Sequence, residues 1–211
     1  MKNIKDELQH IILSNEPVGA KDEIKKIQTF LRGNAQTSDG AQKPKFLKSE
    51  ETTTLIAFAE RNTLFYNDII NEDDFISAGA EQRVYRYDDI NVLKVNDSIF
   101  YEYWLDYFNS LLIHNYFFPS TAYNFLGFKI IEDNLFAVVK QEFIIANQPT
   151  DLAYVRRFLA HNGFRNTRNN DYINADLGII FEDLHDENVL SNDGVLFFVD
   201  TVFYLTNNFY K

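Results

Sequence analysis

The sequence FEDLHDENVL at residues 181–190 places a short polar loop between two apolar stretches. These stretches, residues 178–181 and 189–190, have the apolar character of short β-strands. Within the loop, Asp183 precedes Asn188 by five residues. Carboxylate and amide oxygens are ligands that Mg²⁺ accepts, and a carboxylate can also act as a general base. This loop is the strongest candidate for a functional site in the chain.

A second acidic position follows the loop. Residues 194–201 read GVLFFVDT, so Asp200 closes an apolar strand twelve residues after Asn188. An aspartate in this position acts either as a turn former or as an oxygen ligand for a cation.

Upstream, residues 73–95 alternate apolar and polar side chains and are interrupted at Gly79 and at Asp88-Asp89. This pattern predicts three short strands, near 74–78, 82–87 and 91–95. Lys94 stands among apolar residues of the third strand. Burying an ammonium group is costly unless an anion meets it, although a long lysine stem can also carry its charge to the surface.

The remaining elements are predicted by the same criteria. Residues 125–131 and 135–145 indicate two strands joined at Glu132-Asp133-Asn134. Aromatic residues recur at helical spacing from Phe100, after a turn and N-cap at residues 96–98. Residues 150–160 indicate another helix, and short strands follow at 172–173, 178–181, 189–190 and 195–199.

Transfer of a phosphoryl group requires a turn that admits the phosphates, a lysine, a carboxylate that orients the attacking hydroxyl, and oxygen ligands for Mg²⁺. The chain offers these parts in order: the turn at Gly79, then Lys94, then Asp183, then Asn188 with Asp200. Each signal is weak to moderate alone, but the chain holds all four parts that phosphoryl transfer requires.

These segments resemble motifs of protein kinase-like and aminoglycoside phosphotransferase-like folds, from about Phe75 to Phe203. The phrases FISAGAEQRVY, SIFYEYWLDYFNSLLIHNYFFPSTAY, VVKQEFI and FEDLHDENVL resemble more closely the polyvalent protein kinase domain of phage polyvalent proteins and bacterial mobile elements. This resemblance covers the last two thirds of the chain. Phe181 and Glu182 depart from the family pattern, which has histidine and arginine at these positions.

The resemblance implies an α+β, protein kinase-like fold. Its N-lobe would be a five-stranded antiparallel sheet with one helix, and its reduced C-lobe would carry the catalytic-loop hairpins. The implied domain limits are a helical region at 1–70 with a linker near 33–48, and a minimal kinase-like domain at 71–211. Within that domain the N-lobe would span about 71–145 and the C-lobe about 146–211.

The resemblance also assigns roles to individual residues, with ATP and Mg²⁺ as cofactors. Asp183 would be the catalytic base, Lys94 would hold the phosphates, and Asn188 and Asp200 would bind the metal. The nucleotide would be covered by the turn at Gly79 and Val84, and its adenine would lie near Val92, Leu190 and the hinge residues Gln141 and Phe143.

Glu102 is the candidate partner of Lys94, eight residues after it. At 100° per residue, however, Glu102 lies roughly opposite the aromatic stripe of the predicted helix. Either that helix buries both faces, or Glu102 is solvated and Lys94 has another partner such as Glu81. The Asn- and Arg-rich segment 162–174, with Arg165 and Arg168, is expected to be a surface turn that can also meet phosphate or substrate.

Upstream of residue 70 the pattern predicts amphipathic helices that act as a support or as a partner-binding arm. Apolar residues recur at helical spacing over 4–12 and 24–31, with Gly33 as the expected stop, and a third helix is predicted from Ser49.

Composition limits the partners. The 211 residues carry 20 Lys+Arg against 31 Asp+Glu, a net charge of −11, with 45% apolar residues and no cysteine. This charge disfavours direct nucleic-acid binding, whereas a nucleotide can still bind beside a local cation or metal. No stretch is long and apolar enough for a membrane span, and we expect a cytoplasmic protein.

Two functions from different classes remain open. The first is an ATP- and Mg²⁺-dependent phosphotransferase whose acceptor, a small molecule or a partner protein, is unknown. The alternative is a catalytically inactive pseudokinase or a nucleotide-binding interaction module. The chain stops eleven residues after Asp200, without the helices that form a peptide-docking platform in full protein kinases, so ordinary protein phosphorylation is in doubt. A metal-dependent hydrolase is weaker, because the consecutive polar residues of one loop do not all reach one ion.

Overall fold

The computed structural model describes residues 3–16, 22–37, 48–79 and 81–211. It divides into two compact units, which are described separately below. Unit 1 contains residues 1–16, 109–122 and 144–211, and unit 2 contains residues 17–108 and 123–143. In the described part of the chain, every helix is too short or too polar to cross a membrane.

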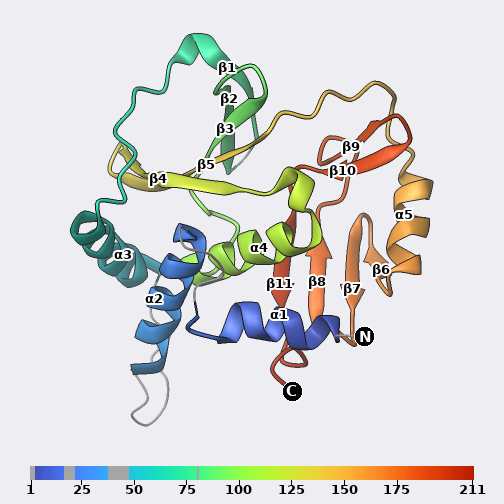
Figure 1. Cartoon of the computed structure of the whole chain (residues 1–211), viewed down its shortest axis with the longest axis horizontal. Helices are drawn as coiled ribbons and strands as arrows, with labels where there is room; N and C mark the ends of the chain where they lie inside the picture. The colour runs from blue at the N-terminus through green and yellow to red at the C-terminus, as the bar shows by residue number, and fades with distance from the viewer. Residues whose placement is uncertain (1–2, 17–21, 38–47, 80) are drawn as a thin grey trace. The chain divides into compact units, whose positions relative to one another are not determined.

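Unit 2 is built on a five-stranded antiparallel sheet (Figure 1). The strand order is β1-β2-β3-β5-β4. Its strands are β1 (Phe75–Ala78), β2 (Gln82–Arg86), β3 (Asn91–Asn96), β4 (Asn124–Ile131) and β5 (Asn134–Glu142). The five strands confirm the prediction from alternation, because each neighbouring pair except β3 and β5 is a local hairpin.

Helices α2 (Glu23–Thr37) and α3 (Lys48–Asn62) also belong to unit 2, with the short 3-10 helix η1 (Glu72–Asp74). Phe30 and Phe58 stack with ring centroids 4.0 Å apart and so join the two helices. The predicted stop at Gly33 was wrong, since α2 continues through it to Thr37. A glycine inside a helix costs only about 1 kcal/mol, which neighbouring turns can offset. The remaining linker residues 38–47 lie outside the described residues.

The segment after α3 adds to the edge of this sheet. The Phe128 amide donates to Leu64 O, and the Tyr66 amide donates to Phe128 O, both over 2.7 Å. The backbones are so close here that a Cβ on Gly127 would lie 2.6 Å from Tyr66 N, and Gly127 has φ +150°. Only glycine fits this position without a backbone shift.

Helix α4 (Trp104–Phe117) contributes residues to both units. It begins later than predicted, because Ser98 takes a left-handed backbone conformation with φ +56° and residues 99–103 form a turn followed by bends. Its first amides are capped by a side chain distant in sequence: Glu51 of α3 accepts from Trp104 N (2.6 Å) and Leu105 N (3.2 Å).

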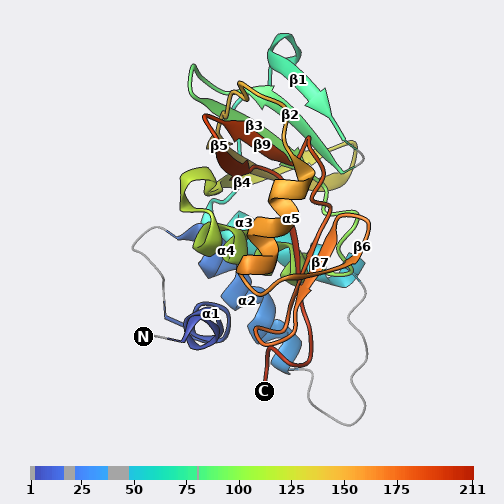
Figure 2. The ribbon, with the colours of Figure 1, turned by 90° about the vertical axis from the view of Figure 1, so that its right-hand side faces the viewer.

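Unit 1 contains a four-stranded antiparallel sheet in the order β11-β8-β7-β6 and a separate hairpin, β9-β10. Figure 2 shows α5 lying beside β6. The elements of this unit are α1 (Ile4–Leu13), η2 (Pro119–Thr121), α5 (Leu152–His161), β6 (Arg165–Arg168), β7 (Asp171–Asn174), β8 (Ile179–Glu182), β9 (Val189–Asn192), β10 (Val195–Phe198) and β11 (Val202–Leu205).

Strands β6 and β11 differ from the prediction. Residues 165–168 were expected to form a surface turn but pair with β7, and the exposed turn lies at Asn169-Asn170. Strand β11 was not predicted at all, and it pairs with β8 through Phe203 and Phe181. Strand β6 reads RNTR and has no apolar residue to give a strand signal, whereas β11 reads VFYL and does have the composition of a strand.

The core of unit 1 is aromatic. Phe181 and Phe203 stack with ring centroids 4.1 Å apart, and Phe118 and Phe198 stack at 4.3 Å. Phe181, which stands where the family pattern has histidine, is therefore a core residue directly before the polar loop.

Candidate active site

Asp183 directly follows β8 and has a left-handed backbone, with φ +64°. This conformation is uncommon for non-glycine residues, although aspartate adopts it more readily than most. Its amide donates to Asp171 Oδ1 over 3.2 Å. The Asn188 side-chain amide donates to Asp183 O (2.8 Å) and to Asp183 Oδ2 (3.0 Å). A strained residue held from two sides is typical of a functional site.

Asn188 also joins the loop to the segment that carries Asp200. Its carbonyl accepts from Val199 N over 2.9 Å and from Asp200 N over 3.4 Å. The structure therefore brings Asp183, Asn188 and Asp200, which are predicted site residues, into one neighbourhood of unit 1.

His185 lies against the same pair of side chains. Its Nε2 is 3.4 Å from Asp183 Oδ1 and 3.1 Å from Asn188 Nδ2, and its Nδ1 faces the Glu187 amide at 3.3 Å. These contacts are those of a group that fixes the loop.

Carboxylates dominate the electrostatics of the loop. Burial, with further contributions from Asp171 and Asp183, raises the pKa of Glu182 above its usual range, and Arg168 acts in the opposite direction. A concentration of negative charge favours a cation here.

The oxygen ligands present fit Mg²⁺ better than a transition metal. No group of three or more His, Cys, Asp or Glu side chains able to hold a metal occurs among residues 3–16, 22–37, 48–79 and 81–211. Mg²⁺ needs no such group, because it is held by one or two carboxylates together with substrate phosphates and water. Asp200 offers a carboxylate, and Asn188 retains Oδ1 because its Nδ2 points to Asp183.

Lys94 lies at the centre of the unit 2 sheet. It is 4% exposed and pairs in register with Val84 on one side and Val139 on the other. Its Nζ is 5.4 Å from the centroid of the Tyr123 ring, which provides a cation–π contact. Val92, two residues earlier on β3, shares this sheet face and is also buried.

The turn before β2 is exposed. The Gly79 amide donates to Gln82 O over 2.8 Å, and an added Cβ on Gly79 would meet nothing closer than Gln82 O at 4.0 Å. Steric crowding within the described residues therefore does not require glycine at this position. Ala80, beside it, lies outside the described residues.

Glu102 is exposed and precedes α4 by two residues, so it is not on the helix where the sequence placed it. Its Oε1 accepts from Tyr103 OH over 2.9 Å. It also contributes to the electrostatics of Asp106: burial first, and then the charge of Glu102, raise the pKa of Asp106 to about 6. The pairing of Glu102 with Lys94 remains a prediction.

The predicted adenine-binding residues occur in both units. In unit 2, Gln141 is 1% exposed, and the Phe143 amide donates to Ile90 O over 2.8 Å, so this backbone donor is already used. In unit 1, Leu190 on β9 is half-buried and pairs with Phe197.

Asp171 is a site residue that sequence reasoning missed. It lies at the start of β7, twelve residues before Asp183, and its carboxylate binds the Asp183 amide. The only signal was its place in the polar segment 162–174, where it resembles any turn aspartate.

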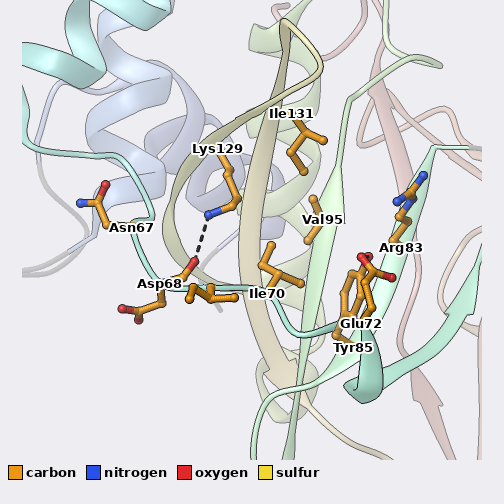
Figure 3. A pocket seen from close by; sticks show the side chains of 10 residues that line it. Asn67, Asp68, Ile70, Glu72, Arg83, Tyr85, Val95, Lys129 and Ile131 are labelled. Atoms are coloured by element: carbon orange, nitrogen blue, oxygen red, sulfur yellow. Dashed lines mark hydrogen bonds between the residues drawn. The ribbon is translucent and has the colours of Figure 1, made fainter.

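A separate hollow of about 360 Å³ lies on unit 2, between the segment after α3 and the sheet (Figure 3). Val95 lines it, and successive strand residues point to opposite faces, so this hollow lies on the face opposite Lys94. Lys129 closes one side by donating to Asp68 O over 2.9 Å. The hollow is therefore distinct from the nucleotide site that the sequence predicts around Lys94.

Comparison with known protein families gives a match over most of the chain. A family described as serine/threonine/tyrosine kinase found in polyvalent proteins matches residues 48–207, about three quarters of the chain. No curated protein and no solved structure is detectably similar to the chain.

Proposed function

This chain belongs to the kinase family found in polyvalent proteins, and from that premise we propose that it is an ATP- and Mg²⁺-dependent phosphotransferase. The observation that carries the proposal is the convergence of Asp183, Asn188 and Asp200 through hydrogen bonds within unit 1. Residues seventeen positions apart along the chain meet at one loop, and they are the residue types that phosphoryl transfer needs.

Asp183 is the proposed base. Its carboxylate accepts the proton of an acceptor hydroxyl while that oxygen attacks the γ-phosphorus and ADP leaves. The hydrogen bond from Asn188 orients Oδ2, and His185 Nε2 lies 3.4 Å from Oδ1. The left-handed backbone, fixed by Asp171, holds this carboxylate in place before substrate arrives.

Asn188 Oδ1 and the Asp200 carboxylate are the proposed metal ligands. When bound, Mg²⁺ supplies charge that offsets the phosphates and the charge developing on them. Lys94 is the proposed phosphate clamp, because a buried ammonium group benefits from an anion. Glu102 is the proposed partner of Lys94, and Gly79, Val84, Val92, Gln141, Phe143 and Leu190 are the proposed nucleotide contacts.

The proposal extends to the correspondence between the two units and the lobes of a kinase. The sheet of unit 2 corresponds to a kinase N-lobe, and the hairpins of unit 1 correspond to a reduced C-lobe, with the helical region 1–70 as an addition. The acceptor is a small molecule or a partner protein that provides its own docking geometry. We place the activity in the cytoplasm and the chain among the proteins of phages and bacterial mobile elements.

The alternative is a nucleotide-binding module without turnover. One observation favours it: Phe181 and Glu182 stand where the family pattern has histidine and arginine, and Phe181 is buried in the core directly before Asp183. Such a module would bind nucleotide without releasing ADP.

The test combines binding and turnover in the full chain. Thermal shift with ATP, with and without Mg²⁺, measures binding, because a ligand of the folded state raises the melting temperature. ADP release in the presence of MgATP measures turnover with water as acceptor. We expect Asp183→Asn to lower turnover by roughly 10²–10⁴-fold while MgATP affinity changes less than about threefold.

Two further variants test the proposed phosphate clamp and the proposed metal ligand: Lys94→Ala and Asp200→Ala. Each is expected to weaken MgATP binding, and the Asp200→Ala variant should also lose the difference between ATP with and without Mg²⁺. Asp176→Asn, at an exposed position in the turn between β7 and β8, is the matched control and should behave as the unaltered chain does. Binding without measurable turnover in the unaltered chain would favour the alternative, and absence of any nucleotide binding would contradict both functions.

A further inference from the structure

The segment that follows Asp200 is anchored to α4 by side chains of unit 1. Thr201 is 5% exposed, and its Oγ1 lies 2.7 Å from His114 Nδ1. Ser110, one helical turn before His114, donates to Thr201 O over 3.5 Å and accepts from Phe203 N over 3.0 Å. Two α4 side chains therefore bind the backbone and hydroxyl of the segment directly after Asp200.

The hydrogen bonds of His114 have a definite direction. The side chain is fully buried, and its Nε2 lies 2.7 Å from Thr121 O. A carbonyl oxygen can only accept, so Nε2 carries the hydrogen. In the neutral ring Nδ1 is then an acceptor, and the Thr201 hydroxyl donates to it. This arrangement determines both the orientation of the ring and the position of Thr201.

The segment before Asp200 is held as well. The Thr121 hydroxyl donates to Phe198 O over 2.7 Å, and Val199 N donates to Asn188 O over 2.9 Å. The backbone on both sides of Asp200 is thus bound to α4, to η2 and to the loop residue Asn188.

We propose that Ser110 and His114 are positioning residues, which act through Thr201 to hold Asp200 in the orientation that binds Mg²⁺. The inference rests on the proposed function, because it takes Asp200 to be the metal ligand. Groups that orient a metal ligand typically change metal affinity 10–100-fold when removed. The metal affinity of the site is therefore set partly by a helix that supplies no ligand to it.

The chemistry of α4 supports a positioning role. The helix is otherwise strongly apolar in this part, with Leu111, Leu112 and Ile113 all buried. A buried polar group costs free energy unless it is fully hydrogen-bonded, and apolar residues would fill the same space without that requirement. A bonded network, unlike apolar packing, specifies one orientation of the groups it joins.

The test compares Thr201→Val, which removes the hydroxyl at nearly constant volume, with Thr201→Ser, which keeps it. The Mg²⁺ concentration at half-maximal ATP-dependent thermal shift should rise about tenfold in Thr201→Val and less than about twofold in Thr201→Ser. Amide hydrogen exchange without nucleotide gives an independent readout: exchange at Val199, Asp200 and Phe203 should be faster in Thr201→Val alone.

Tyr116→Phe is the matched control on the same helix. It removes the hydrogen bond from Tyr116 OH to Glu7 Oε2 (2.6 Å), which does not lead to Asp200, so Mg²⁺ dependence should not change. If Thr201→Val does not fold, Ser110→Ala gives the same comparison. If Thr201→Val has the same Mg²⁺ dependence and the same amide hydrogen exchange as the unaltered chain, the inference is overturned while the proposed function stands. An unaltered chain that binds no MgATP would instead overturn the proposed function, and the metal role of Asp200 with it.

Discussion

At the scale of single residues, the polar loop is stabilised in a backbone conformation that it would not adopt alone. Asp183 has φ +64°, and its amide, carbonyl and carboxylate are all bound, by Asp171 and by Asn188. Left-handed backbone costs a non-glycine residue about 1 kcal/mol or more, so these bonds must offset it. The loop is thus organised around the residue proposed to act as the base.

Asp106 provides a pH prediction at the same scale. Burial and Glu102 raise its pKa from 3.8 to about 6. A carboxyl group with a raised folded-state pKa binds its proton more tightly in the folded chain than in the unfolded chain. The ionised Asp106 carboxylate therefore lowers the stability of the fold above pH 6, and this loss of stability disappears as the pH falls toward 4. We expect Asp106→Asn to stabilise the chain by roughly 1–2 kcal/mol at pH 7 and by little at pH 4, measured by urea unfolding.

Asparagine can still accept from Tyr103 N as the carboxylate does, so this variant isolates the charge. Asp89→Asn, at an exposed position of unit 2, serves as control and should change stability by less than about 0.5 kcal/mol at either pH. If Asp106→Asn changed stability equally at pH 7 and at pH 4, this result would contradict the raised pKa of Asp106.

At the scale of elements, the start of α4 depends on one side chain of α3. Glu51 lies in the first turn of α3, yet it caps the first two amides of α4. Lys48, one turn earlier on α3, donates to Tyr101 O over 3.0 Å and so binds the bends that lead into α4. The start of α4 is therefore determined by α3 rather than by its own sequence.

Glu51→Ala should lower the free energy of unfolding by about 1–2 kcal/mol, because it removes a cap that accepts from two amides. Urea unfolding monitored by far-ultraviolet circular dichroism measures this loss. Glu60→Ala, at an exposed position of the same helix, should change stability by less than about 0.5 kcal/mol. Equal effects of the two substitutions would rule out the cap.

At the scale of the whole molecule, unit 1 extends beyond the region matched by the kinase family. Helix α1 precedes residue 48 but belongs to this unit, with Leu8 and Ile12 almost fully buried. Lys5 donates to Asn208 O over 2.7 Å, and Glu7 accepts from Tyr116 OH over 2.6 Å. An N-terminal helix thus stabilises the unit that carries the candidate site.

Leu8→Ala should therefore destabilise unit 1 by roughly 2–4 kcal/mol, the cost of a cavity in a packed core. Hydrogen exchange across β8 and β11 measures this effect within the unit. Leu13→Ala is the control, since Leu13 is 38% exposed, and should cost less than about 1 kcal/mol. Unaltered exchange in Leu8→Ala would show that α1 does not support the unit.

Local pattern alone determined much of this protein. Alternation and turn residues predicted β1 to β5, because hairpin partners are neighbours in sequence and the side-chain period of a strand is independent of its tertiary surroundings. The loop 181–190 was recognisable because its candidate residues Asp183 and Asn188 lie only five positions apart, and the kinase family followed from this loop together with three stretches upstream of it. The site assignments themselves remain predictions.

Only the tertiary structure decided which distant residues support these elements. Asp171 binds the Asp183 amide, Glu51 caps α4, and His114 binds Thr201 over a separation of 87 residues. Strand β11 likewise forms because Phe203 stacks on Phe181 in the core. Such contacts leave no periodic signal: an Asp, Glu or His that accepts a distant hydrogen bond has the same local sequence as one that faces water. Folding alone brings those partners together, and burial then makes their hydrogen bonds matter.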